Sequence, residues 1–169
     1  MMISKQALMK SKLKTAQQGI TIIEVMIIII SIGIIAGFSV VTYSGIKAKA
    51  RNVTRTNDIR SIQQYIEEFY AHNIYYPTLA DINSQSWRAT NMAGLSPKIL
   101  QDPSWTVTNK ACTLNGKPIF LTKSQNGCYG YQASNNGSSC ASSQNSCSDY
   151  TLSATLEQGE GTYAKQQLD

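Results

Sequence analysis

One apolar run near the start of the chain constrains the fold more than any other feature. From Ile20 to Val41 the sequence holds 22 residues with a single charged side chain, Glu24. A helix needs about 20 mainly apolar residues to cross the hydrocarbon core of a bilayer. An acidic side chain at mid-bilayer costs roughly 2.5 to 3.5 kcal/mol, so an intramembrane carboxylate is by default a functional-site hypothesis. The sequence therefore predicts a membrane-spanning helix whose carboxylate needs a partner.

The preceding segment predicts the source of that partner. Residues 1–19 contain four lysines and no acidic residue, and they end on Gly19 directly before the apolar run. Such a segment is typical of a leader that is removed by proteolysis. Cleavage after Gly19 would leave Ile20 with a free ammonium group near Glu24. Because opposite charges attract much more strongly in a low-dielectric setting than in water, we expect the two groups to pair.

Together these features resemble the signal of a known family. The basic leader, Gly19, the apolar first mature residue Ile20, then Thr21, Glu24 and a long apolar helix resemble the class III signal of type IV pilins and type II secretion pseudopilins. The resemblance implies that a prepilin peptidase cleaves between Gly19 and Ile20 and methylates the Ile20 amine. It also implies that Thr21 and Glu24 serve assembly, with Glu24 engaging Ile20 of a neighbouring subunit. Phenylalanine is commoner than isoleucine at this position in the family.

Two other interpretations of the amino-terminal segment are open. A secretory signal peptide has an apolar region of about 7 to 15 residues and a small-x-small cleavage site. Ala48-Lys49-Ala50 offers such a site, but the apolar run is longer and Glu24 would be unexplained. A plain single-span anchor would place Glu24 near the lipid headgroups, and the Gly-x-Thr-x-x-Glu arrangement would then be a coincidence.

Charge alone neither orients the segment nor indicates a nucleic-acid partner. Basic residues flank the apolar run on both sides, so the positive-inside count is nearly balanced. The resemblance places the leader in the cytoplasm and residues from about 45 onward outside. Removing the four leader lysines lowers the net charge from +5 to +1. We interpret Lys47, Lys49, Arg51 and Arg55 as a solvated helical face at the membrane exit.

The helix is predicted to continue beyond the apolar run. Ile59, Ile62, Ile66 and Phe69 recur at helical spacing, and the first proline is Pro77. This pattern is typical of an amphipathic helix with one buried stripe. We therefore expect one long helix, with a membrane and assembly half at residues 20–41 and an amphipathic half at residues 42–72.

Residues 73–169 are predicted to form one extracytoplasmic globular domain. Tyr150, Leu152, Ala154 and Leu156 alternate with polar residues, as in a half-buried strand, and Thr78-x-x-Asp81 resembles a helix capping box. Shorter strands are predicted at residues 105–108, 118–122 and 128–133. We expect three or four antiparallel strands packed on the helix stripe, which gives an α+β, pilin-like fold. Five tyrosines should pack with their hydroxyls at the surface: Tyr75, Tyr76, Tyr129, Tyr131 and Tyr150.

All four cysteines lie in this predicted outer domain. An even number of cysteines in an oxidising compartment favours disulfides, here with three possible connectivities. We favour neighbour pairing, because a closed loop of about 15 residues stabilises by roughly 3 kcal/mol in the chain-entropy model. The predicted pairs are Cys112 with Cys128 and Cys140 with Cys147. Zinc is the alternative, but the sequence has no Cys-x-x-Cys and its one histidine, His72, lies far upstream.

The sequence gives little support for catalysis, and we expect no cofactor or metal. His72 lies where the long helix should end, and Asp81, Asp102 and Asp149 are isolated in sequence. A calcium site near the last strands would be conceivable by analogy with some pseudopilins, but the spacing does not specify one. Few basic residues accompany the tyrosines, so a stacking platform for single-stranded nucleic acid is possible but unsupported.

The sequence thus predicts a non-enzymatic structural subunit of a type IV pilus or pseudopilus. It would first lie in the cytoplasmic membrane with its carboxyl-terminal domain outside, then in a filament at the cell surface or in the periplasm. The expected partners are copies of itself, the prepilin peptidase, the membrane, and pilus or type II secretion assembly machinery. The alternative is a membrane-tethered binding module, such as an adhesin or a DNA-uptake minor pilin.

Overall fold

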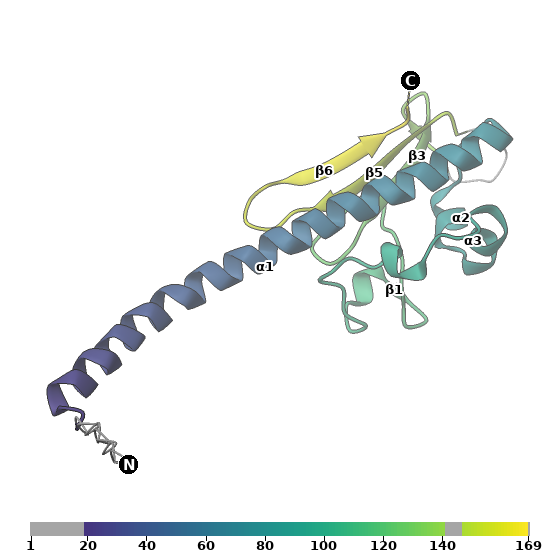
Figure 1. Ribbon diagram of the computed structural model, residues 1–169. Coiled ribbons are helices and arrows are strands. Elements are labelled where there is room, and N and C mark those ends of the chain that lie inside the picture. Colours follow the sequence, from purple (N-terminus) through teal and green to yellow (C-terminus); the bar gives the residue numbers. More distant parts are fainter. Residues whose placement is uncertain (1–18, 141–146, 169) are drawn as a thin grey trace, which may run out of the picture. The chain divides into compact units, whose positions relative to one another are not determined.

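The chain divides into two compact units, and the boundary between them in the sequence lies between Thr42 and Tyr43. The computed structural model describes residues 19–140 and 147–168, without the side chains of residues 38–42. A long helix, α1, has the bounds Ile22–Asn73 and confirms the prediction of one long amino-terminal helix. The second unit, which we call the head, contains residues 43–73 of this helix and all the other elements (Figure 1).

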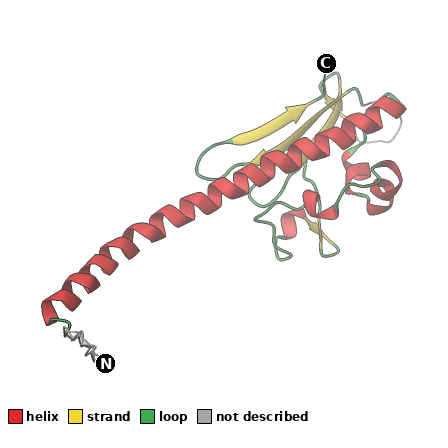
Figure 2. Ribbon diagram, in the orientation of Figure 1, coloured by secondary structure: helices red, strands yellow, loops and turns green. Residues whose placement is uncertain are grey.

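One face of α1 is buried within the head. The exposed fractions of Ile59, Ile62, Ile66 and Phe69 are 0%, 1%, 0% and 4%, so the predicted stripe is confirmed. Figure 2 shows this part of α1 running alongside the sheet, within the same unit. Ile59, Ile62 and Ile66 belong to the core that they form with residues of the sheet. Burial of a large apolar side chain contributes about 1.5 to 3 kcal/mol, which makes this stripe a main attachment of the helix to the head.

The end of α1 has an unusual residue in the capping position. Ile74 follows the last helical residue with φ of 63°, and its N–H donates to the carbonyl of Tyr70 at 2.7 Å. This left-handed conformation commonly ends helices, although glycine usually occupies it and a β-branched residue rarely does. The chain then turns through Tyr75, Tyr76 and Pro77 into the rest of the head.

Four short helices follow. They are α2 (Leu79–Asn83), α3 (Gln85–Asn91) and the 3-10 helices η1 (Pro97–Leu100) and η2 (Lys110–Cys112). The predicted capping box begins α2. The Asp81 N–H donates to Thr78 Oγ1 at 3.2 Å, and the Thr78 N–H donates to Asp81 Oδ2 at 2.9 Å. Ser84, Ser96 and Asn109 similarly accept backbone N–H groups at the starts of α3, η1 and η2.

The main sheet is antiparallel and has the strand order β4-β3-β5-β6. Its strands are β3 (Gly130–Asn135), β4 (Ser138–Ser139), β5 (Asp149–Thr155) and β6 (Thr162–Gln166), and a separate hairpin pairs β1 (Thr113–Leu114) with β2 (Lys117–Pro118). In β5 the predicted apolar positions Tyr150, Leu152 and Ala154 are buried, at 1% exposed or less. The alternation is incomplete, because Ser153 is also buried at 8% and the predicted Leu156 lies after the strand ends at Thr155. The α+β, pilin-like fold expected from the sequence is therefore present.

Two strand predictions need correction. Residues 105–108 form no strand, because their backbone closes local turns: Trp105 N–H donates to the Asp102 carbonyl at 2.8 Å, and Asn109 N–H donates to the Thr106 carbonyl at 2.9 Å. In the predicted strand at residues 118–122, only Pro118 belongs to a strand, β2. Leu121 instead makes an isolated parallel bridge to Gly130.

Gly130 lets a loop approach the sheet closely. A Cβ atom at this position would lie 2.3 Å from the Ser124 backbone nitrogen and 2.6 Å from Ser153 Oγ. Real contacts are never so short, so a larger residue would displace the loop or the strand. Glycine here allows residues 121–124 to pack directly against the start of β3.

Candidate functional site

The first turn of α1 contains the residues of the predicted signal. Thr21 precedes the helix, and its Oγ1 accepts the Glu24 N–H at 3.3 Å while its carbonyl accepts the Val25 N–H at 3.3 Å. Thr21 is thus an N-cap residue and Glu24 is the third residue of the helix, which are the positions of a capping box. The spacing Thr21-x-x-Glu24 therefore has a local structural role that the resemblance did not reveal.

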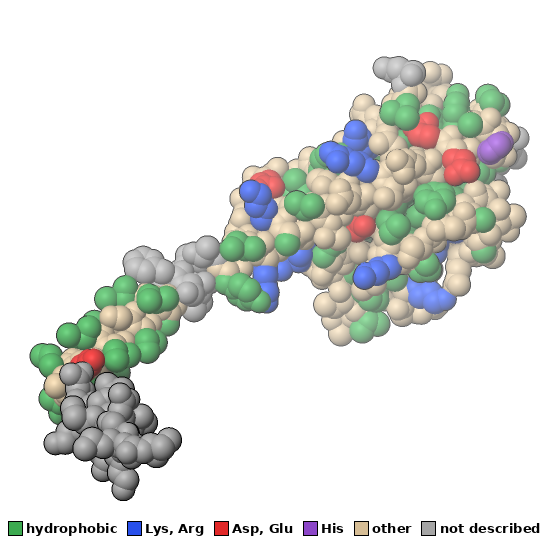
Figure 3. Space-filling model, viewed as in Figure 1, with side chains coloured by type: hydrophobic (Ala, Val, Ile, Leu, Met, Phe, Trp, Pro, Cys, Tyr) green, Lys and Arg blue, Asp and Glu red, His purple; other side chains and the backbone are tan. Residues whose placement is uncertain are grey.

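Glu24 is an exposed carboxylate on an apolar segment. Among the residues that the structure describes, no hydrogen bond or ion pair involves its carboxylate. Neighbouring apolar side chains are also exposed, for example Ile22 at 83%, Ile23 at 64% and Ile27 at 59%. Figure 3 shows hydrophobic side chains covering this part of α1. A negative charge near a helix amino terminus is favourable, but the apolar surface around it has no partner within the described chain.

The residues on either side of the predicted cleavage point are also exposed. Gly19 and Ile20 precede α1, and the Ile20 side chain is 75% exposed. The leader at residues 1–18 lies outside the described residues. Further along the helix, a Cβ at Gly33 or Gly37 would meet no atom within 4 Å apart from the adjoining residues and backbone of its own helix, so a second helix could approach closely at these two positions.

The sequence predicts that residues 20–41 cross a membrane. Across the described part of the chain, no helix combines the length and the apolar character that a membrane crossing requires.

In the head, a buried arginine joins α1 to two distant loops. Arg55 is 0% exposed. Its Nε donates to Asp102 Oδ2 at 2.7 Å, and its Nη2 donates to Asp102 Oδ1 at 3.0 Å and to Ser104 Oγ at 2.8 Å. Its Nη1 donates to Asn52 Oδ1 at 2.9 Å and lies 2.9 Å from Glu157 Oε1. All three guanidinium nitrogens of Arg55 thus have hydrogen-bond or ion-pair partners, which a buried charge requires.

Glu157 extends this cluster to the loop between β5 and β6. Arg51 Nε donates to Glu157 Oε1 at 2.7 Å, and the Glu157 N–H donates to Asn52 Oδ1 at 2.9 Å. The hydrogen bond from Arg51, followed by that from Arg55, lowers the pKa of Glu157 to about 2 against the opposing effect of burial. Burial acts to lower the pKa of Arg55, but its bonds to Asp102 and Glu157 outweigh burial and raise it. Both arginines therefore hold their charges in fixed ion pairs.

These contacts correct the interpretation of the basic residues as one solvated face. Lys47 and Lys49 are exposed, and the Lys47 ammonium lies 4.4 Å from the centroid of the Tyr43 ring. Arg51 and Arg55 are instead ion-paired structural residues. The carboxylates that bind them come from loops that follow much later in the sequence, so helical periodicity could not reveal them.

The tyrosine hydroxyls are also placed differently from the prediction. Glu67 on α1 accepts the hydroxyls of Tyr150 at 2.7 Å and Tyr76 at 3.1 Å. Tyr131 donates to the Pro77 carbonyl at 2.6 Å, and a fourth buried tyrosine, Tyr129, donates to Asp58 at 2.7 Å. Burial is the largest cause that raises the pKa values of these four tyrosines. Their hydroxyls therefore hold the head together from within.

One of the two predicted disulfides is present. Cys112 and Cys128 are bonded, with Cα atoms 5.8 Å apart. Cys140 and Cys147 are free thiols, so the second predicted disulfide is absent from the structure. Burial, followed by a hydrogen bond with Cys140, raises the pKa of the Cys147 thiol to about 12. The two thiols are thus neighbours, and the residues between 141 and 146 lie outside the described part of the chain.

A known protein is similar to part of this chain. Over 62 residues, which is 37% of the chain, the sequence is 32% identical to the type II secretion system core protein G of Escherichia coli strain K12. The chain spans 43% of the length of that relative. No protein family profile and no solved structure match the chain. The similarity supports a pilin-like family, in agreement with the fold, but it does not bear on the leader signal.

The histidine and aspartates considered in the sequence lie apart from one another in the described residues. No group of three or more His, Cys, Asp or Glu side chains within them could hold a metal ion. His72 lies exposed in the last turn of α1, and Asp102 is committed to Arg55. Asp81 caps α2.

Proposed function

We propose that the chain is a structural subunit of pilin or pseudopilin type, which polymerises through the first half of α1 into a type IV pilus or a pseudopilus. The observation that carries this proposal is Glu24, an exposed carboxylate without a described partner on a helix of exposed isoleucines. The pilin-like fold and the similarity to a type II secretion core protein support it. A structural, non-enzymatic role agrees with the pilin-like fold and with this similarity.

Processing is the first step of the proposed mechanism. A prepilin peptidase hydrolyses the peptide bond between Gly19 and Ile20 and leaves an ammonium group on Ile20, which it then methylates. Gly19 has no side chain, and no heavy atom outside its chain neighbours lies within 4 Å of where a Cβ would be. This openness suits a bond that must enter a peptidase site. The processed segment resides in the membrane until the subunit is assembled.

Assembly then replaces lipid with copies of the same helix. Apolar side chains that are exposed in one subunit contact those of its neighbours, and Gly33 and Gly37 allow close approach of the helices. The Ile20 ammonium of one subunit pairs with the Glu24 carboxylate of another. Because a buried ion pair adds little net stability but an unpaired buried charge costs several kcal/mol, this pair favours one axial register over others.

Removing the Glu24 carboxylate tests the proposal. In Glu24→Ala, we expect the leader to be cleaved normally and the sheared filament fraction to fall to background. Glu68 is an exposed residue of the same helix within the head, so Glu68→Ala is the matched control and should assemble as the wild type does. Normal filaments from Glu24→Ala would contradict the pairing role. If the wild-type protein stays with the membrane after shearing and also gives no oligomers on cross-linking in intact cells, the tethered-module alternative is favoured.

A further inference from the structure

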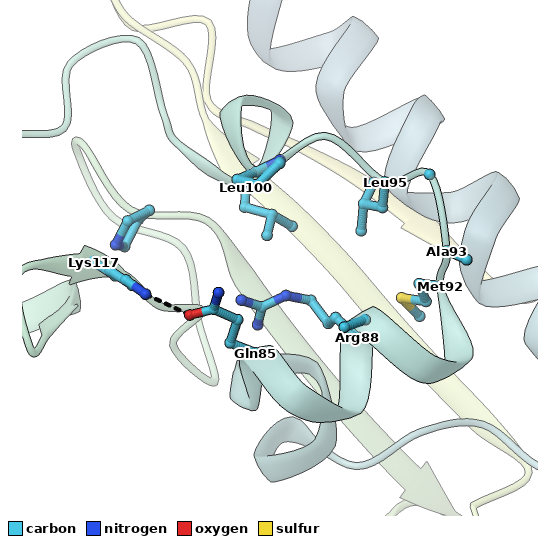
Figure 4. A pocket seen from close by; sticks show the side chains of 11 residues that line it. Gln85, Arg88, Met92, Ala93, Leu95, Leu100 and Lys117 are labelled. Atoms are coloured by element: carbon cyan, nitrogen blue, oxygen red, sulfur yellow. Dashed lines mark hydrogen bonds between the residues drawn. The ribbon is translucent and has the colours of Figure 1, made fainter.

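The head contains a pocket that the proposed assembly does not use. It has a volume of about 540 Å³ and lies between α3, η1 and β2. This volume is within the range of about 300 to 1,000 Å³ that is typical of ligand pockets. Figure 4 shows Leu95 and Leu100 facing Gln85 and Arg88 of α3, and Met92 directly after that helix, across the pocket.

The lining of the pocket is largely apolar but carries two cations. Arg88 comes from α3 and Lys117 from β2, and no aspartate or glutamate is among the residues that line the pocket. Lys117 Nζ donates to Gln85 Oε1, and Arg88 Nη1 donates to the Ile82 carbonyl (Figure 4 shows the first of these bonds). Both contacts are to neutral oxygens, so neither positive charge has a carboxylate partner among the described residues.

Arg88 is the unusual member of this pair because its side chain is half-buried. Burial alone lowers its pKa, with no contribution from a nearby carboxylate. By contrast, Arg51 and Arg55 of α1, which are half-buried and buried, both form ion pairs. A charge that is partly removed from water without an ion partner is unfavourable, and a bound anion would relieve that cost. The planar guanidinium suits a carboxylate, which it can bind through two parallel N–H groups.

We infer that this pocket docks a partner protein through an apolar peptide segment that carries one carboxylate. The carboxylate binds between Arg88 and Lys117, and the flanking apolar side chains cover Leu95, Pro97 and Pro118, which line the pocket and are exposed or half-buried. Met92 and Leu100 are already 3% and 8% exposed, so they form a firm apolar base. The apolar wall favours a peptide over a free phosphate, which would leave that wall exposed to water. This inference concerns the head alone and does not depend on leader cleavage or on polymerisation.

Capped tripeptides provide the probe. The full chain in detergent micelles is titrated with acetyl-Leu-Glu-Leu-amide, and NMR shifts of Ala89, Met92 and Lys117 report binding. Charge-assisted hydrogen bonds are roughly twice as strong as neutral ones, so we expect the glutamate peptide to bind about tenfold more tightly than the same peptide with glutamine. Equal affinities, no binding of either peptide, or tighter binding of inorganic phosphate would each overturn the inference.

Two substitutions locate the site. Arg88→Gln should weaken binding of the glutamate peptide about tenfold and leave binding of the glutamine peptide unchanged. Because Arg88 also bonds to Ile82, Lys117→Gln provides a second variant at an exposed residue, and it should weaken binding in the same selective way. Lys110 is exposed and lies outside the pocket, so Lys110→Gln is the matched control. An equal loss in Lys110→Gln and Lys117→Gln would show unspecific charge attraction and refute the docking site.

Discussion

Arg55 and Asp102 form a bidentate ion pair in which both side chains are 1% exposed or less, with Nε and Oδ2 2.7 Å apart. The pair joins the middle of α1 to the loop that follows η1. Truncating one partner of a buried pair leaves an uncompensated charge and costs about 3 to 5 kcal/mol. The pair is therefore expected to be a main determinant of how the helix is held in the head.

Asp102→Ala should lower the free energy of unfolding of the head by about 3 to 5 kcal/mol. The remaining Arg55 guanidinium would be buried with Glu157 as its one ion partner. Denaturant titration of the full chain measures the effect. Glu68→Ala removes an exposed carboxylate from the same unit and should change the free energy by about 0.5 kcal/mol or less. Similar losses in both variants would contradict the structural role of the pair.

Stability should also depend on the ionisation of Glu157. Its hydrogen bonds from Arg51 and Arg55 lower its pKa in the folded state from the ordinary 4.5 to about 2. A carboxylate whose pKa is lowered on folding stabilises the fold above its unfolded pKa, and this contribution is lost as the pH falls toward the folded pKa. The contribution is thus complete at neutral pH and disappears between pH 4.5 and about 2.

A comparison with Glu157→Gln isolates this effect. The difference in unfolding free energy between the wild type and the variant should be constant above pH 4.5 and shrink as the pH falls toward 2. The difference is needed because Asp58 affects stability in the opposite direction. Burial raises the pKa of Asp58, so its ionisation destabilises the fold as the pH rises, and this contribution cancels between the two proteins. A difference that is independent of pH over this range would show that Glu157 is not held as an ion pair.

The disulfide between Cys112 and Cys128 should stabilise the part of the head that is poor in regular structure. The two residues are 16 apart in sequence, and closing a loop of this length contributes about 3 kcal/mol in the chain-entropy model. Replacing both cysteines with alanine should lower the unfolding free energy by about that amount. Cys140→Ala removes a free thiol and no cross-link, so it should respond to a reducing agent as the wild type does, whereas the double variant should not respond.

The N-cap residue Thr21 gives a prediction for the stability of the first turn of α1. The Glu24 N–H donates to both the hydroxyl and the carbonyl of Thr21, at 3.3 and 3.1 Å. Thr21→Val keeps the shape of the side chain and the carbonyl but removes the hydroxyl acceptor, which should destabilise the first turn by about 1 kcal/mol. Amide hydrogen exchange at Glu24 in micelles should become faster in Thr21→Val and remain unchanged in Thr21→Ser. Equal exchange in the three chains would show that the threonine hydroxyl does not cap the helix.

The parts of the fold that depend on local periodicity could be predicted from the sequence. The stripe from Ile59 to Phe69, the capping box at Thr78 and the buried apolar positions of β5 each arise from spacing within a single element. Spacing identifies the buried face, since a helix or strand repeats its orientation at a fixed interval. From these patterns alone, the packing of the helix stripe on the sheet could be predicted without knowledge of any long-range contact.

Contacts between distant segments could not be predicted in this way. Arg55 binds Asp102 at a separation of 47 residues, and Arg51 binds Glu157 at a separation of 106. A single sequence holds no signal for such pairs, and basic residues in a helix suggested a solvated face. The same limit applies to Tyr150, whose hydroxyl finds Glu67 at a separation of 83 residues. The turn at residues 105–108 was missed because its β-prone residues form local backbone bonds instead.

The mass of the protein isolated from its own cells tests the central claim most directly. Our account predicts an amino terminus at Ile20 carrying one methyl group, and a shift back to the uncleaved mass in Gly19→Val. An intact chain that begins at Met1 in the wild type, or a mature chain that begins at Arg51 after the Ala48-Lys49-Ala50 site, would contradict it.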